Sequence, residues 1–568
     1  MRRFVLYGSL LMIAFVPLAC GGATTAPPAE KPLTLEALPA IDGKAVMEHV
    51  NVLASDEYEG RAIGTRGEEL SVAYITAQLK AIGLKPGNTD GTYIQKVPLV
   101  GITVKDKPVL TFRKGQRRQD LAWRDDYVAW TKRAVESVSV KGSDMIFVGY
   151  GVQAPEFGWD DYKGLDLKGK TMVVLVGDPP VPDPANPEAL DQKVFGGRAM
   201  TYYGRWSYKF EMGAKMGAEA VIIVHETEPA AYPFSVVQGN VSEQFDLVAP
   251  DKNMGRAAVE GWITLDQAKK LFAMAGKDFD QLKKAAVTRD FKPVPLGATA
   301  TVTLDNSLRT IDSSNVVAKV EGSDPVLKDE YVIYTSHWDH FGIGQPVNGD
   351  KIYNGALDNA TGVAGVIELG RAFTKAAPAP KRSILLLFVT AEEQGLLGSG
   401  YYAENPIYPL TKTAGVVNID SMNMWGKTSD MVVVGLGNSD LDDYMRQAAG
   451  EQGRVLKPDP TPEKGSYYRS DHFPFAKQGV PAINAGGGTD FVGKPADWGI
   501  TKREEYTKND YHKPSDEIRP DWTMDGALQD LQLYLAVGYR VANAGRLPEW
   551  KPGSEFKARR DAQMGNLK

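Results

Sequence analysis

The spacing of apolar and polar residues divides the chain into three regions. In the first, from about Leu35 to Val100, one helix is predicted to carry its apolar residues on a single face, at Val72, Ile75, Leu79 and Ile82. Thr65 and Glu68 have the spacing of a capping box at the start of this helix, and Gly83 is expected to end it. We therefore expect this region to be largely helical.

The second region, roughly residues 140–295, has the pattern of short β-strands. The runs "DMIFVGYG" and "TMVVLVGDPP" are predicted strands, and "FEMGAKMGAEAVIIVH" is predicted to be a short helix that leads into another strand. His225 at the end of that strand stands apart from any cluster of acids and histidines, and we expect it to be structural. The region therefore predicts a separate β-rich domain without catalytic residues.

In the third region, after about Thr310, continuous apolar runs alternate with helical stretches. Such runs are typical of strands that are buried on both faces, and the helices between them cover the sheet. We therefore predict an α/β fold with a mainly parallel, mixed sheet flanked by helices, one of them at about 361–373. The apolar runs are "YVIYT" (331–335), "SILLLFVT" (383–390), "AGVVNI" (414–419) and "VPAIN" (480–484).

Acids and histidines directly follow these apolar runs. The carboxyl ends of parallel strands meet at one edge of a sheet, where open α/β sheets bind their ligands. Asp358, before a predicted helix, and His512, in "DYHKPSDE", are further candidates. Those at the strand ends are His337, Asp339 and His340 after the first run, Glu392 and Glu393 after the second, and Asp420 after the third.

Each of these residues also has an ordinary structural explanation. Asp358 could cap the helix that starts near Thr361, and the two glutamates could begin a solvated helix. Asp420 and His512 could lie in surface turns. So many acids and histidines at strand ends nevertheless favour a metal site over this set of coincidences.

The available donor groups narrow the choice of metal. The only cysteine is Cys20, near the N-terminus, so the site would consist of histidine and carboxylate, which suits zinc and also cobalt or manganese. Five candidate ligands exceed what one catalytic zinc ion uses, which indicates two ions that share a carboxylate. Of Glu392 and Glu393, one can bind metal while the other deprotonates the attacking water.

Several ordered motifs are similar to those of a known family. "SHWDH", "NGALDNATG", "AEEQGLLGS", "NIDSMNM" and "YHKPSDE" resemble the successive motifs of the co-catalytic zinc exopeptidases, which include bacterial aminopeptidases, glutamate carboxypeptidase and the inactive transferrin receptor. "LASDEYEGRAIGTRG" resembles the start of the bacterial members. "GYG", "DLKGKTMVVLVGD" and "GAKMGAEAVIIVH" resemble the protease-associated domain inserted in many of them. The resemblance covers nearly all of the chain after the N-terminal leader.

The resemblance implies two zinc ions per chain and a particular ligand set. His337 and Asp420 would bind one ion, and Glu393 and His512 the other. Asp358 would bridge the two.

The resemblance also assigns roles around the metal. Glu392 would be the general base, and Tyr511 would help to hold the oxyanion of the reaction. The residues expected beside the ligands rather than among them are Asp339, which would orient the imidazole of His337, Asp471, His472 and His340, which would stabilise the loop.

These features predict a zinc-dependent exopeptidase, an aminopeptidase that removes N-terminal residues from peptides. A carboxypeptidase or an aminoacyl cyclase on the same scaffold stays open as an alternative. A pocket for a C-terminal carboxylate would show convergent arginines, and Arg469 alone stands out near the motifs. An inactive binding protein would have lost ligands, and here all are present.

The N-terminus predicts export. In "MRRFVLYGSLLMIAFVPLACGG" two arginines precede an apolar run that is too short for a membrane span, as in a secretory signal. Cys20 lies at the expected cleavage point and resembles the lipidated cysteine of bacterial lipoproteins. We therefore expect a periplasmic or outer-membrane-anchored lipoprotein, with simple secretion as the alternative and with no intramolecular disulfide.

The predicted layout follows from these regions. The net charge of −6 argues against nucleic acid as the main partner, which leaves peptide substrates and, through the lipid alone, a membrane. The basic residues near Lys557 are expected to form a solvated tail. The segments are a signal peptide (1–19), a linker (20–34), an N-terminal part of the peptidase domain (35–139), a protease-associated domain (140–295), the zinc peptidase domain (305–548) and a C-terminal tail (549–568).

Overall fold

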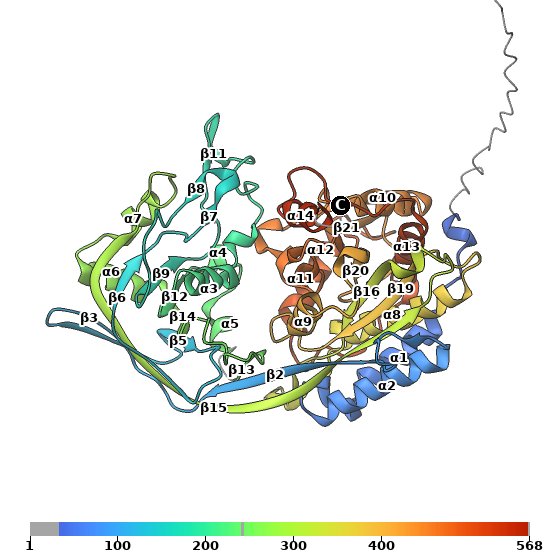
Figure 1. The fold of residues 1–568 in the computed structure, drawn as a ribbon, viewed down its shortest axis with the longest axis horizontal. Coiled ribbons are helices and arrows are strands. Elements are labelled where there is room, and N and C mark those ends of the chain that lie inside the picture. The colour runs from blue at the N-terminus through green and yellow to red at the C-terminus, as the bar shows by residue number, and fades with distance from the viewer. Residues whose placement is uncertain (1–32, 240–242, 566–568) are drawn as a thin grey trace, which may run out of the picture.

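The computed structural model describes residues 33–239 and 243–565. The predicted signal peptide, Cys20 and most of the predicted linker lie outside these residues. Figure 1 shows two bodies side by side, joined by two long strands, β2 (Ile94–Val104) and β15 (Val294–Val320). Within the described residues, no helix is long and apolar enough to cross a membrane.

The larger body is built on a mixed sheet, as predicted. Its central strands β19, β16, β20 and β23 are parallel neighbours, while β15 and β21 pair antiparallel with β19 and β23 at either side. The α/β fold class is thereby confirmed. In order across the sheet the strands are β2, β15, β19 (Ser383–Val389), β16 (Tyr331–His337), β20 (Thr413–Asn418), β23 (Ala482–Gly487), β21 (Asp430–Val434) and β22 (Val455–Pro458).

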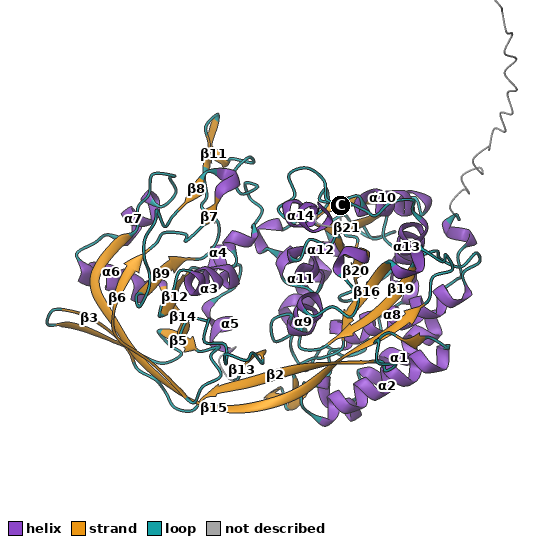
Figure 2. Ribbon diagram, viewed as in Figure 1, coloured by secondary structure: helices purple, strands orange, loops and turns teal. Residues whose placement is uncertain are grey.

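Helices cover both faces of this sheet (Figure 2). Along β16, Val332 and Tyr334 pack into one apolar cluster, whereas Tyr331 and Ile333 pack into another on the opposite face. This alternation explains why the strand reads as a continuous apolar run. The first face is covered by α1 (Gly43–Leu53), α2 (Arg66–Ile82), α8 (Thr361–Lys375), α10 (Leu441–Glu451) and α13 (Met524–Asn543), and the second by α9 (Leu397–Glu404) and α11 (His472–Lys477).

Helix α2 begins and ends where the sequence predicts. The Thr65 hydroxyl accepts a hydrogen bond from the Gly67 N–H at 3.2 Å, and Gly83 ends the helix in the left-handed region at φ 85°. Both bonds of the predicted capping box are shifted by one residue, because Thr65 accepts from Gly67 rather than from Glu68, and the Glu68 carboxylate accepts from the Gly64 N–H at 2.6 Å rather than from Thr65. The same carboxylate also accepts from Ser313 on β15, which ties the helix to the sheet.

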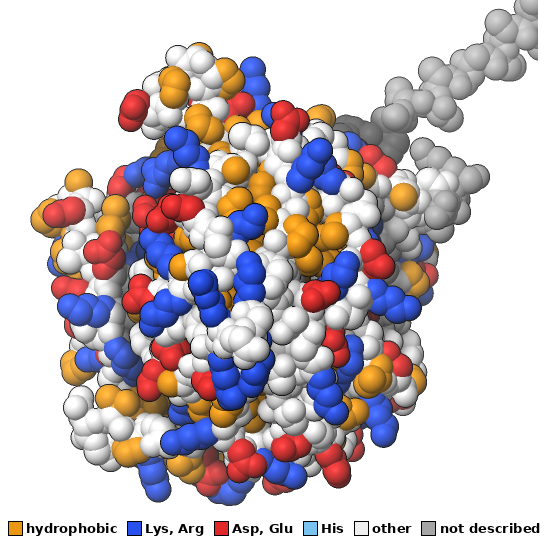
Figure 3. Space-filling view, turned by 90° about the vertical axis from the view of Figure 1, so that its left-hand side faces the viewer, with side chains coloured by type: hydrophobic (Ala, Val, Ile, Leu, Met, Phe, Trp, Pro, Cys, Tyr) orange, Lys and Arg blue, Asp and Glu red, His pale blue; other side chains and the backbone are white. Residues whose placement is uncertain are grey.

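The smaller body is β-rich and has its own apolar core. Its helix α3 (Trp206–Lys215) lies on one face of the sheet, and α6 (Leu265–Ala275) and α7 (Phe279–Ala285) lie on the other. Figure 3 shows positive and negative side chains interspersed over its outer face. The strands, in order, are β4 (Arg117–Leu121), β3 (Leu110–Lys114), β15, β6 (Ser137–Phe147), β9 (Thr171–Leu175), β12 (Ala220–His225), β14 (Val259–Thr264) and β5 (Tyr127–Trp130).

The core of the smaller body extends beyond the predicted range of 140–295. Its apolar cluster runs from Leu110 to Leu304, so residues 110–130, expected in the larger body, belong here. The cause is strand pairing: β3 pairs with β15 and β5 pairs with β14. Phe245 on β13 (Gln244–Leu247) is the reverse case, since β13 pairs with β2 and Phe245 packs in the larger core.

The C-terminal segment is packed against the larger body, in contrast to the solvated tail that the sequence predicts. Helix α14 (Lys557–Gly565) buries Arg560, whose guanidinium donates to the carbonyl oxygens of Leu410 and Thr413 at 2.9 and 2.8 Å. Trp550 and Phe556 are also buried, in an aromatic cluster with Tyr467. One residue of this basic run, Arg560, is therefore buried, and its guanidinium satisfies buried carbonyl groups.

Candidate metal centre

The predicted site residues meet at the carboxyl edge of the larger sheet. His337 is the last residue of β16, and Glu392 and Asp420 closely follow the ends of β19 and β20. Asp358 lies in the turn η6 (Ala356–Ala360) that leads into α8. His512 comes from the segment after α12 (Trp498–Asn509). Residues that are distant in sequence thus lie close together, because the carboxyl ends of parallel strands meet at one edge of the sheet.

Two histidines and three carboxylates contact one another across this edge. His337 Nε2 lies 3.2 Å from Asp358 Oδ1 and 3.4 Å from Asp420 Oδ1. His512 Nε2 lies 3.4 Å from Asp358 Oδ2 and 3.1 Å from Glu393 Oε2. The two oxygens of Asp358 therefore face different histidines, which is the arrangement that a bridging carboxylate needs.

These distances fit a pair of bound cations. Donor atoms around a tetrahedral zinc ion, each about 2.0–2.1 Å from the metal, stand roughly 3.4 Å apart. The cluster also concentrates carboxylates where little water reaches them, a costly arrangement that a divalent cation would relieve. The groups whose ligand atoms converge are His337 with Asp358 and Asp420, His337 with Glu392 and Glu393, and His340 with Asp358 and Glu393.

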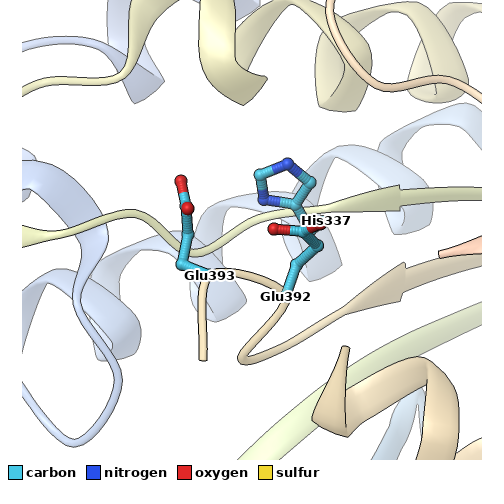
Figure 4. Close-up of side chains that lie close together, drawn as sticks. All are labelled: His337, Glu392 and Glu393. Carbon is cyan, nitrogen blue, oxygen red and sulfur yellow. The ribbon is translucent and has the colours of Figure 1, made fainter. Parts of the chain in front are cut away.

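Glu392 and Glu393 point in different directions from adjacent positions (Figure 4). The carboxylate of Glu392 lies beside the ring of His337, whereas Glu393 extends to the other side of the site. Burial and the neighbouring carboxylates of Asp420 and Glu393 raise the pKa of Glu392 well above its usual value. Burial acts to raise the pKa of Glu393, but His512 and His340 together outweigh it and lower that pKa to about 2.

Asp339 contacts the site in a different way from that expected. Its carboxylate accepts the backbone N–H groups of Glu392 and Glu393, at 3.1 and 3.4 Å. His337 Nδ1 lies 3.2 Å from the Asp339 backbone oxygen but 3.9 Å from its carboxylate. Asp339 therefore holds the backbone of the two glutamates, and the backbone carbonyl contacts the imidazole.

His340 lies inside the cluster, although the sequence analysis placed it beside the ligands. Its Nδ1 is 2.6 Å from Glu393 Oε1, and its backbone N–H donates to the Arg61 carbonyl at 3.3 Å. Both His340 and His512 thus contact Glu393. The spacing of the motif could not distinguish these positions, because the turn after β16 decides where His340 points.

Tyr511 and Phe341 enclose His512 between aromatic rings. The ring of Tyr511 stacks on the imidazole with centroids 3.7 Å apart, and the ring of Phe341 lies 4.6 Å away. Burial and the charge of Asp358 raise the pKa of Tyr511 well above its usual value, so its hydroxyl stays protonated. A protonated hydroxyl can donate a hydrogen bond to a developing oxyanion.

Asp471 and His472 are adjacent in sequence but have different surroundings, and the charges of His337 and Asp420 act on the pKa of Asp471. Asp471 is fully buried and accepts from the Ser399 hydroxyl at 2.5 Å. His472 packs its ring edge-on against Tyr467, at 4.6 Å between centroids, and burial lowers its pKa to about 3. His472 therefore belongs to the aromatic packing of α11, away from the ligands.

Asp516 and Arg61 were not predicted as site residues, yet they hold the segment that contains Asp358. Asp516 accepts from the N–H groups of Leu357 and Asp358, each at 3.0 Å. The guanidinium of Arg61 is 1% exposed and donates to the carbonyl oxygens of Leu53, Trp338, Asn354 and Gly355. Asp516 lies within the motif "YHKPSDE" and Arg61 within "LASDEYEGRAIGTRG". Their presence in these motifs was the one sequence signal for either residue.

Comparison with known families identifies the larger body. Residues 315–536 match the family described as peptidase family M28, and they contain every candidate ligand. This part of the chain is similar to peptidase family M28. The co-catalytic zinc exopeptidase resemblance is thereby confirmed, and the protease-associated domain stays a prediction.

Individual relatives match this chain over part of their length. The leupeptin-inactivating enzyme 1 of Streptomyces exfoliatus is 27% identical over 269 residues, 45% of this chain and 56% of that protein. The aminopeptidase NAALADL1 of Mus musculus is 33% identical over 131 residues, 22% of this chain and 16% of that protein. The chain thus spans about half or less of these relatives.

A solved structure shares the fold of most of the chain. The aminopeptidase from Aneurinibacillus sp. strain AM-1 superposes with a TM-score of 0.51 at 20% identity, over 89% of this chain and 96% of that chain. At this identity the likeness concerns the fold alone.

Proposed function

We propose that this protein is a zinc-dependent exopeptidase, specifically an aminopeptidase that hydrolyses the N-terminal peptide bond of its substrates. The observation that carries the proposal is Asp358, whose two oxygens face His337 and His512 at 3.2 and 3.4 Å, with Glu392 beside His337. The matched peptidase family and the relative named as an aminopeptidase support the same reaction.

Five residues would hold two zinc ions. His337 and Asp420 would bind one, Glu393 and His512 the other, and Asp358 both. His340 would donate a hydrogen bond to Glu393, which its 2.6 Å contact supports. Bound zinc would supply Lewis acidity, which polarises the scissile carbonyl and makes water nucleophilic near neutral pH.

Side chains of the protein would transfer the proton and stabilise the negative charge of the oxyanion. Glu392 would accept the proton of the attacking water and return it to the leaving amine, a role that its raised pKa suits. Tyr511 would donate a hydrogen bond to the oxyanion. Asp339 would keep Glu392 in place through its backbone N–H.

The test is hydrolysis of amino-acid anilides by the purified protein, with N-blocked anilides as controls, before and after treatment with a chelator. We expect cleavage of the free anilides alone, loss of that cleavage with chelator and recovery on adding zinc. Metal analysis should give close to two zinc ions per chain. Cleavage of the N-blocked substrates would contradict the aminopeptidase assignment, and full activity with one ion would contradict the two-metal site.

We further propose that the smaller body is a protease-associated domain and that the protein is exported and anchored by lipid at Cys20. The three sequence motifs support the first proposal, and the apolar leader before Cys20 supports the second. Replacing Cys20 with serine should release the protein from membranes into the soluble fraction. A wild-type protein that is already soluble would contradict anchoring.

A further inference from the structure

The two bodies also contact each other at the segment that leads into α11. Tyr202 lies in the turn η4 (Tyr202–Gly204) of the smaller body. Its ring is 5.7 Å from that of Tyr468 and 4.9 Å from that of Phe473, measured between centroids, and both partners belong to the larger body. One aromatic side chain of the smaller body thus packs against both ends of the segment 468–473.

Polar contacts join the bodies at the same place. The Tyr202 hydroxyl donates to Glu211 of α3 at 2.6 Å and accepts from Lys477 of α11 at 3.0 Å. Lys477 also pairs with Glu211 at 2.8 Å, and Arg198 pairs with Glu463 at 3.1 Å. Exposed ion pairs contribute little to stability, so we expect the aromatic ring to supply most of this contact.

One residue of the segment 468–473 contacts a candidate zinc ligand. Ser470 is buried, and its hydroxyl donates to Asp420 Oδ2 at 2.6 Å and accepts from the side-chain amide of Asn418 at 2.7 Å. The other oxygen of Asp420, Oδ1, faces His337 at 3.4 Å. Ser470 therefore fixes which oxygen of Asp420 is turned toward the candidate metal site.

The larger body holds the same segment at neighbouring residues. Tyr467 stacks on Phe556 with centroids 5.6 Å apart, and Asp471 accepts from the Ser399 hydroxyl at 2.5 Å. The ring of Tyr202 thus packs against a segment that is already anchored from within its own body. Removing that ring should let the segment shift without unfolding it.

We propose that Tyr202 is a positioning residue for the metal centre, through which the smaller body keeps Ser470 against Asp420. Contacts of this kind orient a metal ligand and increase its affinity for the ion. Without the ring, the segment 468–473 shifts and Asp420 gains freedom to rotate, so the zinc ion between His337 and Asp420 binds less tightly. The inference rests on the proposed function, because that ion is part of it. It gives the smaller body a part in metal binding, while the strand pairing of the larger sheet does not depend on this contact.

Zinc titrations of the purified protein in competition with a chelating dye test this inference. The variants are Tyr202→Leu, Tyr202→Phe, Ser470→Ala and the double variant that combines Tyr202→Leu with Ser470→Ala. Tyr203→Leu is the matched control, since the ring of Tyr203 contacts Phe195 and Tyr208 of its own body. If Tyr202→Leu does not fold, the exposed change Lys477→Ala replaces it in every comparison, with the same expected direction.

In Tyr202→Leu, one of the two zinc ions should bind more weakly by about 2- to 30-fold, in the same step of the titration that Ser470→Ala weakens. Tyr202→Phe, which keeps the ring, and Tyr203→Leu should bind both ions as the wild type does. The double variant should bind zinc as weakly as Ser470→Ala alone, because both changes act through one contact.

Unchanged zinc binding in Tyr202→Leu would overturn the inference. The same holds for an equal loss in Tyr203→Leu, or for a full further loss in the double variant. Each of these results would leave the proposed function intact. A wild-type protein that binds no zinc would instead contradict the proposed function, and the inference with it.

Discussion

Glu392 and Glu393 are adjacent in sequence but have different neighbours in the structure. Glu393 contacts His340 and His512, whereas Glu392 lies beside His337 and has a raised pKa. If Glu392 is the base, Glu392→Gln should reduce turnover by roughly 10² to 10⁴ with zinc content unchanged, because glutamine cannot accept the proton. Kinetics and metal analysis on the same preparations measure both effects.

Glu393→Gln is the matched control for this prediction. It should weaken zinc binding, since it removes a charged ligand. Loss of metal in Glu392→Gln with retention in Glu393→Gln would mean that the two roles are exchanged.

His472 should make the folded protein sensitive to acid. Burial lowers the pKa of His472 from 6.5 in the unfolded chain to about 3 in the folded protein. Between these two pH values the unfolded chain therefore binds a proton on this residue, and the folded chain does not. Neutral His472 makes its full contribution to the free energy of unfolding above pH 6.5. This contribution is lost as the pH falls, and the loss is about 2 kcal/mol at pH 5. The free energy of unfolding of His472→Phe, measured at pH 7.5 and pH 5, should fall less between these pH values than that of the wild type. An equal fall in both proteins would show that His472 is not responsible.

His337, Glu393 and Asp420 could be found from the sequence because each follows an apolar run, and parallel strands bring such positions together. Asp358 and His512 were found from their motifs. Arg61 and Asp516 could not be found from the apolar runs. Their roles depend on contacts with backbone groups or charges of distant segments, which no local pattern records. His340 is an intermediate case, since its position was clear but the direction of its side chain was not.

At the scale of elements, the turn η6 is held in place by the segment after α12. Asp516 uses one carboxylate oxygen for each of two N–H groups of that turn. Asp516→Asn turns one acceptor into a donor, so Asp358 should lose its fixed position and zinc affinity should fall by about 10- to 100-fold. Competition with a chelating dye measures the affinity. Glu505→Gln, an exposed change on α12, is the control, and unchanged affinity in Asp516→Asn would exclude the positioning role.

Helix α14 should contribute to stability in a way that a solvated tail would not. Ending the chain at residue 548 removes Trp550 and Phe556 from the aromatic cluster and Arg560 from its two carbonyl partners. The two aromatic side chains alone correspond to roughly 3–6 kcal/mol. Denaturant unfolding should therefore show a large loss of stability compared with a chain that lacks only residues 566–568. A similar midpoint for both truncations would favour the original prediction of a free tail.

At the scale of the whole molecule, the two bodies were predicted from a change in residue pattern near residue 140, whereas strand pairing begins the smaller body at Leu110. The pattern could not show that β15 belongs to both sheets. This strand of 27 residues pairs with β6 and β3 at one end and with β2 and β19 at the other. Its burial alternates in the smaller body and is continuous from Ser313 to Ala318 in the larger sheet. The boundaries between the bodies therefore fall inside strands.

The pairing of β2 with β15 has a consequence for how such a protein could be remodelled. Val104 and Asn306, where the chain leaves and re-enters the larger body, are direct partners in an antiparallel register. Topologically, the smaller body is the loop of one very long β-hairpin, and a two-residue turn is enough to close a hairpin. Everything between these positions could be exchanged for another module, or for a tight turn, without altering the path of the chain through the larger sheet. The smaller body is therefore a replaceable module, and it also supplies strand β13 to the edge of the larger sheet.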